Sequence, residues 1–227
     1  MGFKSLGLID ELLQAVTDMG FKTPMPIQKE AIPLLLSGER DFIGLAQTGT
    51  GKTGAFGLAL LQHMDTSSSK TQGLILCPTR ELCLQITEEL KSFSTHLPRI
   101  RITAVYGGAS IATQINQIKR GAHIIVATPG RLLDLIRRKA VLLGTVNRVV
   151  LDEADEMLNM GFQEDIDAIL SQVPEQRRIW LFSATMPAEV ARIAQTYLTD
   201  PAEITVGNRN QGAENIHHRY GMMHEKD

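Results

Sequence analysis

The sequence AQTGTGKT, residues 46–53, lies between a short apolar run at residues 41–46 and a helical pattern that begins at Lys52. A buried strand, a glycine-rich turn and a helix in this order form the phosphate-binding loop of nucleotide-binding α/β proteins. The strict pattern begins with glycine, and Ala46 takes that place here. The stretch therefore predicts a nucleotide site at the end of a strand. The alternative is a flexible turn rich in Gly and Thr.

Backbone and side-chain groups of this loop would both contact a nucleotide. The N–H groups from Thr48 to Thr53 would point toward a β-phosphate, helped by the helix N-terminus. Gly49 and Gly51 allow positive φ and a close approach of the backbone. Lys52 would reach the β- and γ-phosphates, and the Thr53 hydroxyl would bind Mg²⁺. The predicted nucleotide-binding residues of the loop are Thr48, Gly49, Thr50, Gly51, Lys52 and Thr53.

Outward from this loop, short runs rich in β-branched residues recur along the chain, with amphipathic stretches such as residues 80–96 and 187–198 between them. Most runs are continuously apolar, which is typical of strands covered on both faces. Alternation of strands and helices favours an α/β fold with a parallel sheet of about seven strands and helices on both faces. The predicted strands are residues 41–46, 73–78, 101–106, 122–127, 147–152, 178–183 and 202–206.

Two helical patterns precede the first strand, at residues 8–21 and 26–38. Pro26 suits the first turn of the second helix. Pro33 lacks a backbone donor, so we expect a kink or a break there.

Composition and charge exclude several classes of protein. A hydrophobic fraction of 43% with 21% charged residues is typical of a globular domain that buries a core. The formal net charge of −2 requires any nucleic-acid binding to use a local basic patch or backbone amides. No secretory signal and no apolar window of about 18 residues is present, so we expect no membrane association and a cytoplasmic protein. Cys77 and Cys83 are interpreted as small buried thiols, with a disulfide as the less favoured alternative.

A second chemical feature is LDEAD, residues 151–155, in which three carboxylates follow an apolar strand. Asp152, at the strand end, would hold Mg²⁺ through water. Glu153 would orient or deprotonate the attacking water as a general base. Lys52, Asp152 and Glu153 are therefore the predicted catalytic residues. The alternative is a solvated acidic turn that caps the following helix.

Together LDEAD and AQTGTGKT resemble the DEAD-box family of ATP-dependent RNA helicases, and other motifs match in order. GFKTPMPIQ, residues 20–28, resembles the adenine-reading Q motif, with Gln28 as the invariant amide and Phe3 as the upstream aromatic. An amide can donate to adenine N7 and accept from the 6-amino group. Met25 stands where Thr or Ser is frequent in the family. The alternative for Gln28 is an ordinary surface amide.

The resemblance also implies RNA contacts at PTREL (78–82), GG (107–108) and TPGR (128–131), and coupling of hydrolysis to strand separation at SAT (183–185). The predicted RNA-binding residues are Pro78, Thr79, Arg80, Gly107, Gly108, Thr128, Pro129, Gly130 and Arg131. The predicted coupling residues are Asp155, Ser183 and Thr185, with Asp155 contacting the two hydroxyls. As alternatives, Thr79 is a helix N-cap, the glycines and TPGR only turn the chain, and Ser183 and Thr185 cap a helix starting at Pro187.

The family fold consists of two RecA-like lobes that close on ATP and RNA. By resemblance, residues 1–206 are the N-terminal RecA-like lobe, introduced by the Q-motif region 1–38. Residues 207–227 would be a linker and the start of a second lobe, which would supply arginine fingers. With that lobe, the protein is expected to hydrolyse ATP and to unwind short RNA duplexes or remodel RNA–protein complexes. The chain alone is expected to be a monomer with little or no ATPase activity.

RNA is expected to be held by its backbone with little sequence preference. Two rival functions remain at this point: a DNA helicase or another translocating phosphate-loop ATPase, and an interaction module that has lost catalysis. The Q motif together with DEAD disfavours the first, and the intact Lys52, Asp152 and Glu153 disfavour the second.

Overall fold

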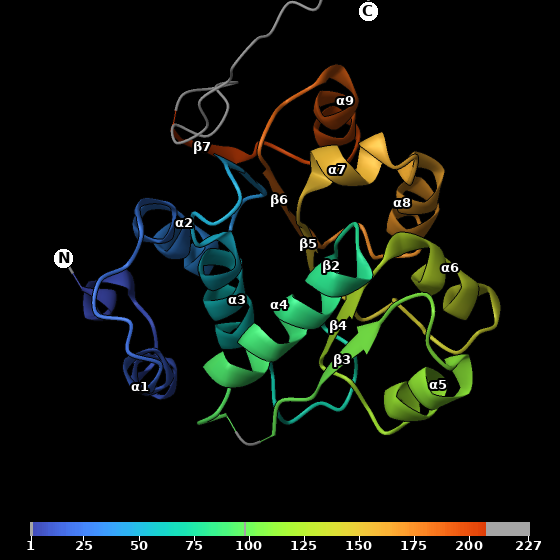
Figure 1. Cartoon of the computed structure of the whole chain (residues 1–227), viewed down its shortest axis with the longest axis horizontal. Coiled ribbons are helices and arrows are strands. Elements are labelled where there is room, and N and C mark those ends of the chain that lie inside the picture. Colours follow the sequence, from blue (N-terminus) through green and yellow to red (C-terminus); the bar gives the residue numbers. More distant parts are fainter. Residues whose placement is uncertain (1, 98, 208–227) are drawn as a thin grey trace, which may run out of the picture.

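The computed structural model describes residues 2–97 and 99–207, and its centre is a seven-stranded sheet in which every paired neighbour is parallel. The strand order is β3-β4-β2-β5-β6-β1-β7. All seven predicted strands are confirmed, with ends that shift by at most two residues (Figure 1). The strands are β1 (Phe42–Ala46), β2 (Gly73–Leu76), β3 (Ile102–Val105), β4 (Ile124–Ala127), β5 (Arg148–Leu151), β6 (Arg178–Ser183) and β7 (Ala202–Val206).

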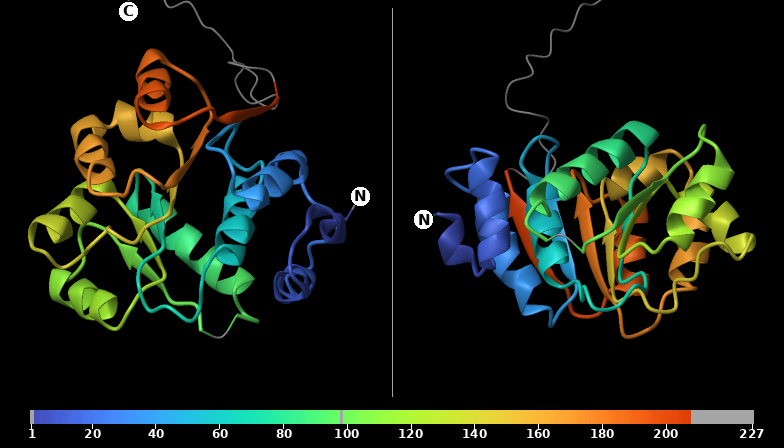
Figure 2. Two further views of the ribbon diagram at one scale, coloured as in Figure 1. Left: turned by 180° about the vertical axis from the view of Figure 1, so that it is seen from behind. Right: turned by 90° about the horizontal axis from the view of Figure 1, so that it is seen from below.

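Helices cover both faces of this sheet, as predicted (Figures 1 and 2). One face packs against the 3₁₀-helix η1 (Phe3–Leu6) and the helices α1 (Asp10–Asp18), α2 (Pro26–Ser37), α3 (Lys52–Gln62) and α4 (Arg80–Phe93). The other packs against α5 (Ile111–Lys119), α6 (Pro129–Arg137), α7 (Ala154–Asn159), α8 (Gln163–Leu170) and α9 (Ala188–Tyr197).

The continuous apolar runs follow from this two-sided packing. Within β2, Ile75 belongs to the first apolar layer, whereas Leu74 and Leu76 belong to the second. Successive side chains of a strand point to opposite faces, so a strand covered on both faces needs apolar residues at every position. Cys77 and Cys83 are free and buried in the first layer, as expected.

The predicted break at Pro33 is wrong, because α2 continues from Pro26 to Ser37. Pro33 lies on the exposed side of the helix, while Ile32 and Leu35 are buried on the other side. The carbonyl that Pro33 leaves without a donor can therefore be solvated, and the buried side holds the helix in place.

Motif-bearing turns follow the carboxyl ends of neighbouring strands, where ligands of open α/β sheets bind. The turns after β3, β4 and β2 carry the three predicted RNA motifs, and those after β5, β6 and β1 carry LDEAD, SAT and the phosphate loop. The described residues contain no helix long and apolar enough to cross a membrane. The predicted linker and second-lobe start fall almost wholly at residues 208–227, outside the described residues.

Candidate nucleotide and RNA site

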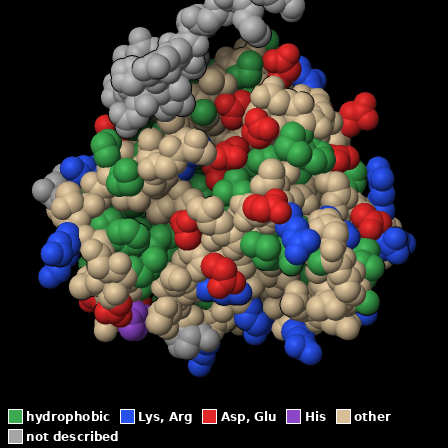
Figure 3. Space-filling model, viewed as in Figure 1, with side chains coloured by type: hydrophobic (Ala, Val, Ile, Leu, Met, Phe, Trp, Pro, Cys, Tyr) green, Lys and Arg blue, Asp and Glu red, His purple; other side chains and the backbone are tan. Residues whose placement is uncertain are grey.

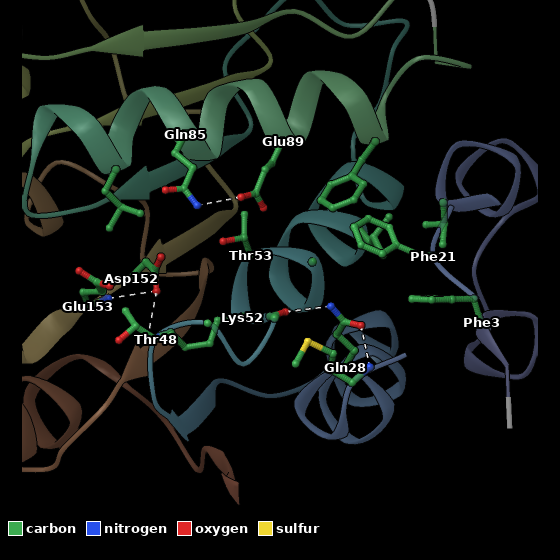
Figure 4. Close-up of a pocket in the computed structure, with 18 residues that line it drawn as sticks. Phe3, Phe21, Gln28, Thr48, Lys52, Thr53, Gln85, Glu89, Asp152 and Glu153 are labelled. Atoms are coloured by element: carbon green, nitrogen blue, oxygen red, sulfur yellow. Dashed lines mark hydrogen bonds and ion pairs between the residues drawn. The ribbon is translucent and has the colours of Figure 1, made fainter. Parts of the chain in front are cut away.

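A cavity of about 460 Å³ opens between the phosphate loop, α4 and the N-terminal segment (Figure 4). This volume lies within the range of small-molecule sites. Phe3 and Phe21 lie at one end of the cavity, and Asp152 and Glu153 lie at the other. Its lining residues are Phe3, Val16, Phe21, Met25, Gln28, Thr48, Gly49, Gly51, Lys52, Thr53, Gly54, Leu58, Leu82, Gln85, Glu89, Phe93, Asp152 and Glu153.

The phosphate loop has the backbone that its glycines predict. Gly49 and Gly51 have φ of 79° and 89°, in the left-handed region, and α3 begins at Lys52 directly after Gly51. Of the six predicted loop residues, all but Thr50 line the cavity. The Thr50 hydroxyl donates to the Gln47 carbonyl at 2.6 Å, which closes the loop on itself.

Lys52 and Asp152 form a buried ion pair at the base of the cavity. Their side chains are only 6% and 3% exposed, and Lys52 Nζ lies 4.0 Å from Asp152 Oδ1. This separation is too long for a hydrogen bond, and Nζ has no hydrogen-bond partner in the described part of the chain. A buried ammonium without hydrogen bonds is costly, so the site is shaped for a further acceptor.

The Asp152 carboxyl is held in an environment that resists its ionisation. Burial raises its pKa to about 6, although Lys52 acts in the opposite direction, and the neighbouring Glu153 raises it further. A cation bound beside Asp152 would favour the carboxylate form. Thr53 contributes a hydroxyl to the wall of the same cavity. One hydroxyl and one carboxylate are hard oxygen ligands suited to Mg²⁺, which takes its remaining ligands from phosphates and water.

Glu153 lies in the cavity wall with an unusual backbone. Its φ of 52° and ψ of 51° are left-handed, a conformation that costs a residue with a side chain roughly 1–2 kcal/mol. Its N–H donates to Asp152 Oδ1 at 3.1 Å. Glu153 is the N-cap of α7 but makes no side-chain capping bond, so its carboxylate is not explained by the helix-capping alternative.

Gln28 joins the Q-motif helix to the phosphate loop. Its Oε1 accepts the Met25 N–H at 2.9 Å, and its Nε2 donates to the Gly51 carbonyl at 3.1 Å. With 9% exposure it is buried, which excludes the ordinary surface amide. A primary amide has two donor hydrogens and two acceptor positions, so one of each is left to pair with adenine.

Nine of the eighteen lining residues were not predicted as site residues, and three of these, Phe21, Gln85 and Glu89, offer an exposed ring or polar groups to a ligand. Phe21 is half exposed at the aromatic end, inside the GFKTPMPIQ segment, where its position was a usable signal. Gln85 and Glu89 lie one turn apart on α4 and are joined by a hydrogen bond of 3.0 Å. Polar residues on an amphipathic helix are usually solvated, so the sequence carried no signal for these two.

Among the predicted RNA-binding residues, Thr79 and Arg80 begin α4. The Thr79 hydroxyl accepts the Leu82 N–H at 3.2 Å, which confirms the N-cap and leaves its RNA contact a prediction. The Arg80 guanidinium lies 5.1 Å from the centre of the Tyr106 ring. Gly107 and Gly108 follow Tyr106 and are exposed, with Gly108 at φ 77°.

Hydrogen bonds connect the TPGR turn to the segment that follows the GG turn. Arg131 Nη1 donates to the Ala109 carbonyl at 3.1 Å and to Gln114 Oε1 at 3.0 Å. Pro78, Thr128 and Pro129 are buried, whereas Gly130 is exposed. The predicted RNA residues therefore divide into buried supports of the turns and exposed groups that can reach a ligand.

The predicted contact between Asp155 and the SAT segment is confirmed. Asp155 Oδ2 accepts the N–H and the hydroxyl of Thr185 at 2.9 and 2.7 Å, and the Asp155 N–H donates to Ser183 Oγ at 3.3 Å. Burial would raise the pKa of Asp155, but the hydrogen bonds from Thr185 and Ser183 outweigh it and hold that pKa below its usual value. The helix α9 makes no side-chain capping bond, which argues against the capping alternative.

Comparison with known proteins identifies a family model, described as DEAD/DEAH box helicase, that matches residues 25–193. The chain is 53% identical over 224 residues to the DEAD-box ATP-dependent RNA helicase CshA of Bacillus cereus, covering 99% of the chain and 42% of that protein. It is 47% identical to CshA of Streptococcus pneumoniae, covering 100% of the chain and 43% of that protein.

A crystal structure of a DEAD box protein from Methanococcus jannaschii superimposes with a TM-score of 0.85 at 41% sequence identity, covering 90% of this chain and 56% of the other. The chain thus spans less than half the length of the two curated relatives. The structural match agrees with the predicted RecA-like sheet.

Proposed function

The chain belongs to the DEAD/DEAH box helicase family, and we propose that it is the nucleotide-binding lobe of an ATP-dependent RNA helicase. The observation that carries this proposal is Lys52 Nζ, which is buried without a hydrogen bond beside the Asp152 carboxylate. A phosphate in the cavity would provide the missing acceptors and stabilise the buried charge.

The cavity has the polarity that an adenine nucleotide requires. The base would lie at the aromatic end, between Phe3 and Phe21, with Gln28 offering one donor and one acceptor. The phosphates would extend along the glycine-containing loop toward Lys52.

Thr53 and Asp152 are the residues that would hold Mg²⁺. Bound there, the ion would neutralise negative charge on the phosphates. The described residues contain no cluster of three or more His, Cys, Asp or Glu side chains able to hold a metal. A site completed by substrate phosphates and water fits this arrangement.

Glu153 would act as the general base. Its left-handed backbone follows Asp152 directly and keeps its carboxylate in the cavity wall, where an attacking water can be oriented. Stabilisation of the negative charge in the transition state would need an arginine from outside this lobe, and we assign that arginine to a second RecA-like lobe. On this account the chain alone has little or no ATPase activity.

RNA would bind across the turns after β2, β3 and β4, which are adjacent in the sheet. Arg80 and Gly107, Gly108 and Gly130 are exposed there, and a guanidinium and open backbone N–H groups suit phosphates more than base edges. The Asp155–Thr185 contact connects the DEAD turn to the SAT turn, and we assign it the coupling of hydrolysis to strand separation.

The test is the ATPase rate of the protein together with its second lobe, measured without nucleic acid, with single-stranded RNA and with DNA of the same sequence. The proposal predicts strong stimulation by RNA and weak stimulation by DNA. Equal stimulation by DNA would favour the DNA helicase instead. Absence of ATP binding by the two-lobe protein would favour the interaction module.

A further inference from the structure

The strand β3 forms one end of the sheet in the described part of the chain. The carbonyl of Arg101, which directly precedes β3, and that of Val105, its last residue, accept hydrogen bonds from residues at the two ends of β4. In a parallel pair, alternate residues direct their backbone groups to the same side. The backbone groups of Ile102 and Ala104 therefore face away from the sheet and are available to a ligand.

A groove of about 580 Å³ runs along this free edge between α4 and α5. Arg101 and Arg120 line it, as does the pair formed by Lys91 Nζ and Glu88 Oε1 at 2.7 Å. Among the described residues, Glu88 is the only acidic residue that lines this groove, and it is already paired with Lys91. The charge of the two arginines is therefore not compensated by the described lining. Figure 3 shows several Lys and Arg side chains on the lower half of this face, where α4, β3 and α5 lie in Figure 1.

At the amino end of β3 the groove continues into a second hollow of about 400 Å³, and Arg101 lines both. This hollow contains the hydroxyls of Ser67–Ser69, the exposed Arg99 and the buried His123. Arg101 is held in place by a hydrogen bond of 3.0 Å from its Nε to the Gly121 carbonyl.

His123 adds a buried donor to this hollow. Its Nδ1 accepts the Arg101 N–H at 2.9 Å, so a neutral ring carries its proton on Nε2. Burial lowers the pKa of His123, which keeps the ring neutral near pH 7. Nε2 is buried, and the Ser68 backbone lies near enough to raise the pKa of the ring, but no well-formed hydrogen bond joins the two within the described residues. The nearby Asp65 does not line the hollow, and its Oδ1 accepts both the N–H and the hydroxyl of Ser67.

At the carboxyl end of β3 the groove reaches the GG turn. Tyr106, Ala109 and Ser110 line it there, and Arg80 lies over the Tyr106 ring. The stretch from Tyr106 to Arg99 contains eight residues, and its seven steps span about 23 Å at ~3.3 Å per step if it is extended. An extended ligand that continues from the GG turn along this edge would therefore contact hydroxyls, backbone groups and the arginines Arg120, Arg101 and Arg99.

We propose that this groove is an accessory track for single-stranded RNA, which binds the segment of RNA that continues beyond the GG turn. The inference rests on the proposed RNA-binding function and extends it to residues outside the family motifs. Positive charge without acidic partners matches phosphates, and a row of hydroxyl and backbone donors matches a ligand recognised by its backbone. An acidic peptide added to the β3 edge is the competing occupant.

The test measures fluorescence anisotropy of labelled oligouridylates of about 6, 10 and 14 nucleotides with this chain, over a range of salt concentrations. The variant Arg99→Gln/Arg120→Gln removes two exposed guanidinium groups that have no partner in the described residues. The matched control, Lys119→Gln/Lys139→Gln, removes the same charge from exposed residues outside both hollows.

Wild-type affinity should rise with RNA length. The arginine variant should keep its affinity for the shortest RNA within about twofold of wild type, but its affinity should no longer increase with RNA length. The slope of its log affinity against log salt concentration should be smaller in magnitude by about 0.7 per lost phosphate contact. The control variant should retain the gain. An unchanged length dependence in the arginine variant would overturn the track, as would tighter binding of a polyglutamate peptide than of the longest RNA. If the wild type binds none of the RNAs, the proposed function itself fails, whereas failure of the length effect alone leaves it intact.

Discussion

Gly54, in the first turn of α3, lies directly beside the Gln28 side chain. A substitution there tests the position of Gln28 and leaves the phosphate-loop residues 46–53 unchanged. A Cβ added at Gly54 would lie 2.5 Å from Gln28 Nε2, closer than side-chain carbons pack. Its next neighbours are Gln28 Cδ at 3.4 Å and Phe93 Cζ at 3.9 Å, both tolerable contacts. In Gly54→Ala the flexible end of Gln28 must therefore move.

Two opposing effects set the change in the free energy of unfolding. Displacement of Gln28 breaks its hydrogen bonds with Met25 and Gly51, and at about 0.5–1.5 kcal/mol each this costs about 1–3 kcal/mol. Replacement of glycine by alanine within a helix contributes about 1 kcal/mol in the other direction. Gly54→Ala should therefore destabilise the wild type by about 0–2 kcal/mol and weaken its preference for ATP over GTP.

The decisive comparison is a double-mutant cycle with Gln28→Ala, followed by urea denaturation of the four proteins. Without the Gln28 amide only the helix-propensity gain remains, so Gly54→Ala should then stabilise by up to about 1 kcal/mol. The coupling energy should be about 1–3 kcal/mol. If Gly54→Ala has the same effect in both backgrounds, Gln28 does not occupy the position described.

Three further predictions concern the DEAD turn. Thr185→Val removes one hydrogen bond to Asp155, which is half buried, and should lower the free energy of unfolding by about 1 kcal/mol at pH 7. That bond stabilises the ionised form of Asp155, whose pKa is lowered in the folded state. The difference in the free energy of unfolding between wild type and Thr185→Val should therefore vanish as the pH falls below the pKa of Asp155 in the folded protein. Urea denaturation of both proteins at several pH values measures this difference. In the two-lobe protein, Glu153→Gln should stop ATP turnover and retain binding of ATP and RNA; normal turnover would exclude Glu153 as the base. Glu153→Gly should also stop turnover, yet raise the melting temperature because it relieves about 1 kcal/mol of left-handed strain; an unchanged or lower melting temperature would contradict the strain.

The sheet could be predicted because its strands are buried on both faces. Continuous apolar runs such as that of β2 have few alternative conformations once turns and helices flank them. The start of α3 at Lys52 was also predictable, because it follows from a motif of fixed spacing. The contact between Asp155 and Thr185 was predicted as well, but it joins two separate motifs. Assignment of this contact relied on the family resemblance, since 30 residues separate the two side chains.

Other features depend on neighbours that no local pattern specifies. Gln85 and Glu89 line the cavity only because α4 crosses over the phosphate loop. The break predicted at Pro33 does not occur because that side of α2 faces solvent. The bonds from Arg131 to Ala109 and Gln114 depend on the adjacency of β3 and β4. In each case the tertiary environment, and not the local sequence, determines the outcome.

The proposed function requires the buried ammonium of Lys52 to bind the phosphates of an adenine nucleotide. Titration calorimetry of the chain with ATP and Mg²⁺ would measure this binding, with Lys52→Ala compared against the wild type and against the exposed control Lys119→Ala. The wild type and the control should bind ATP weakly, and Lys52→Ala should show no detectable binding. An unchanged affinity in Lys52→Ala would contradict the proposed function.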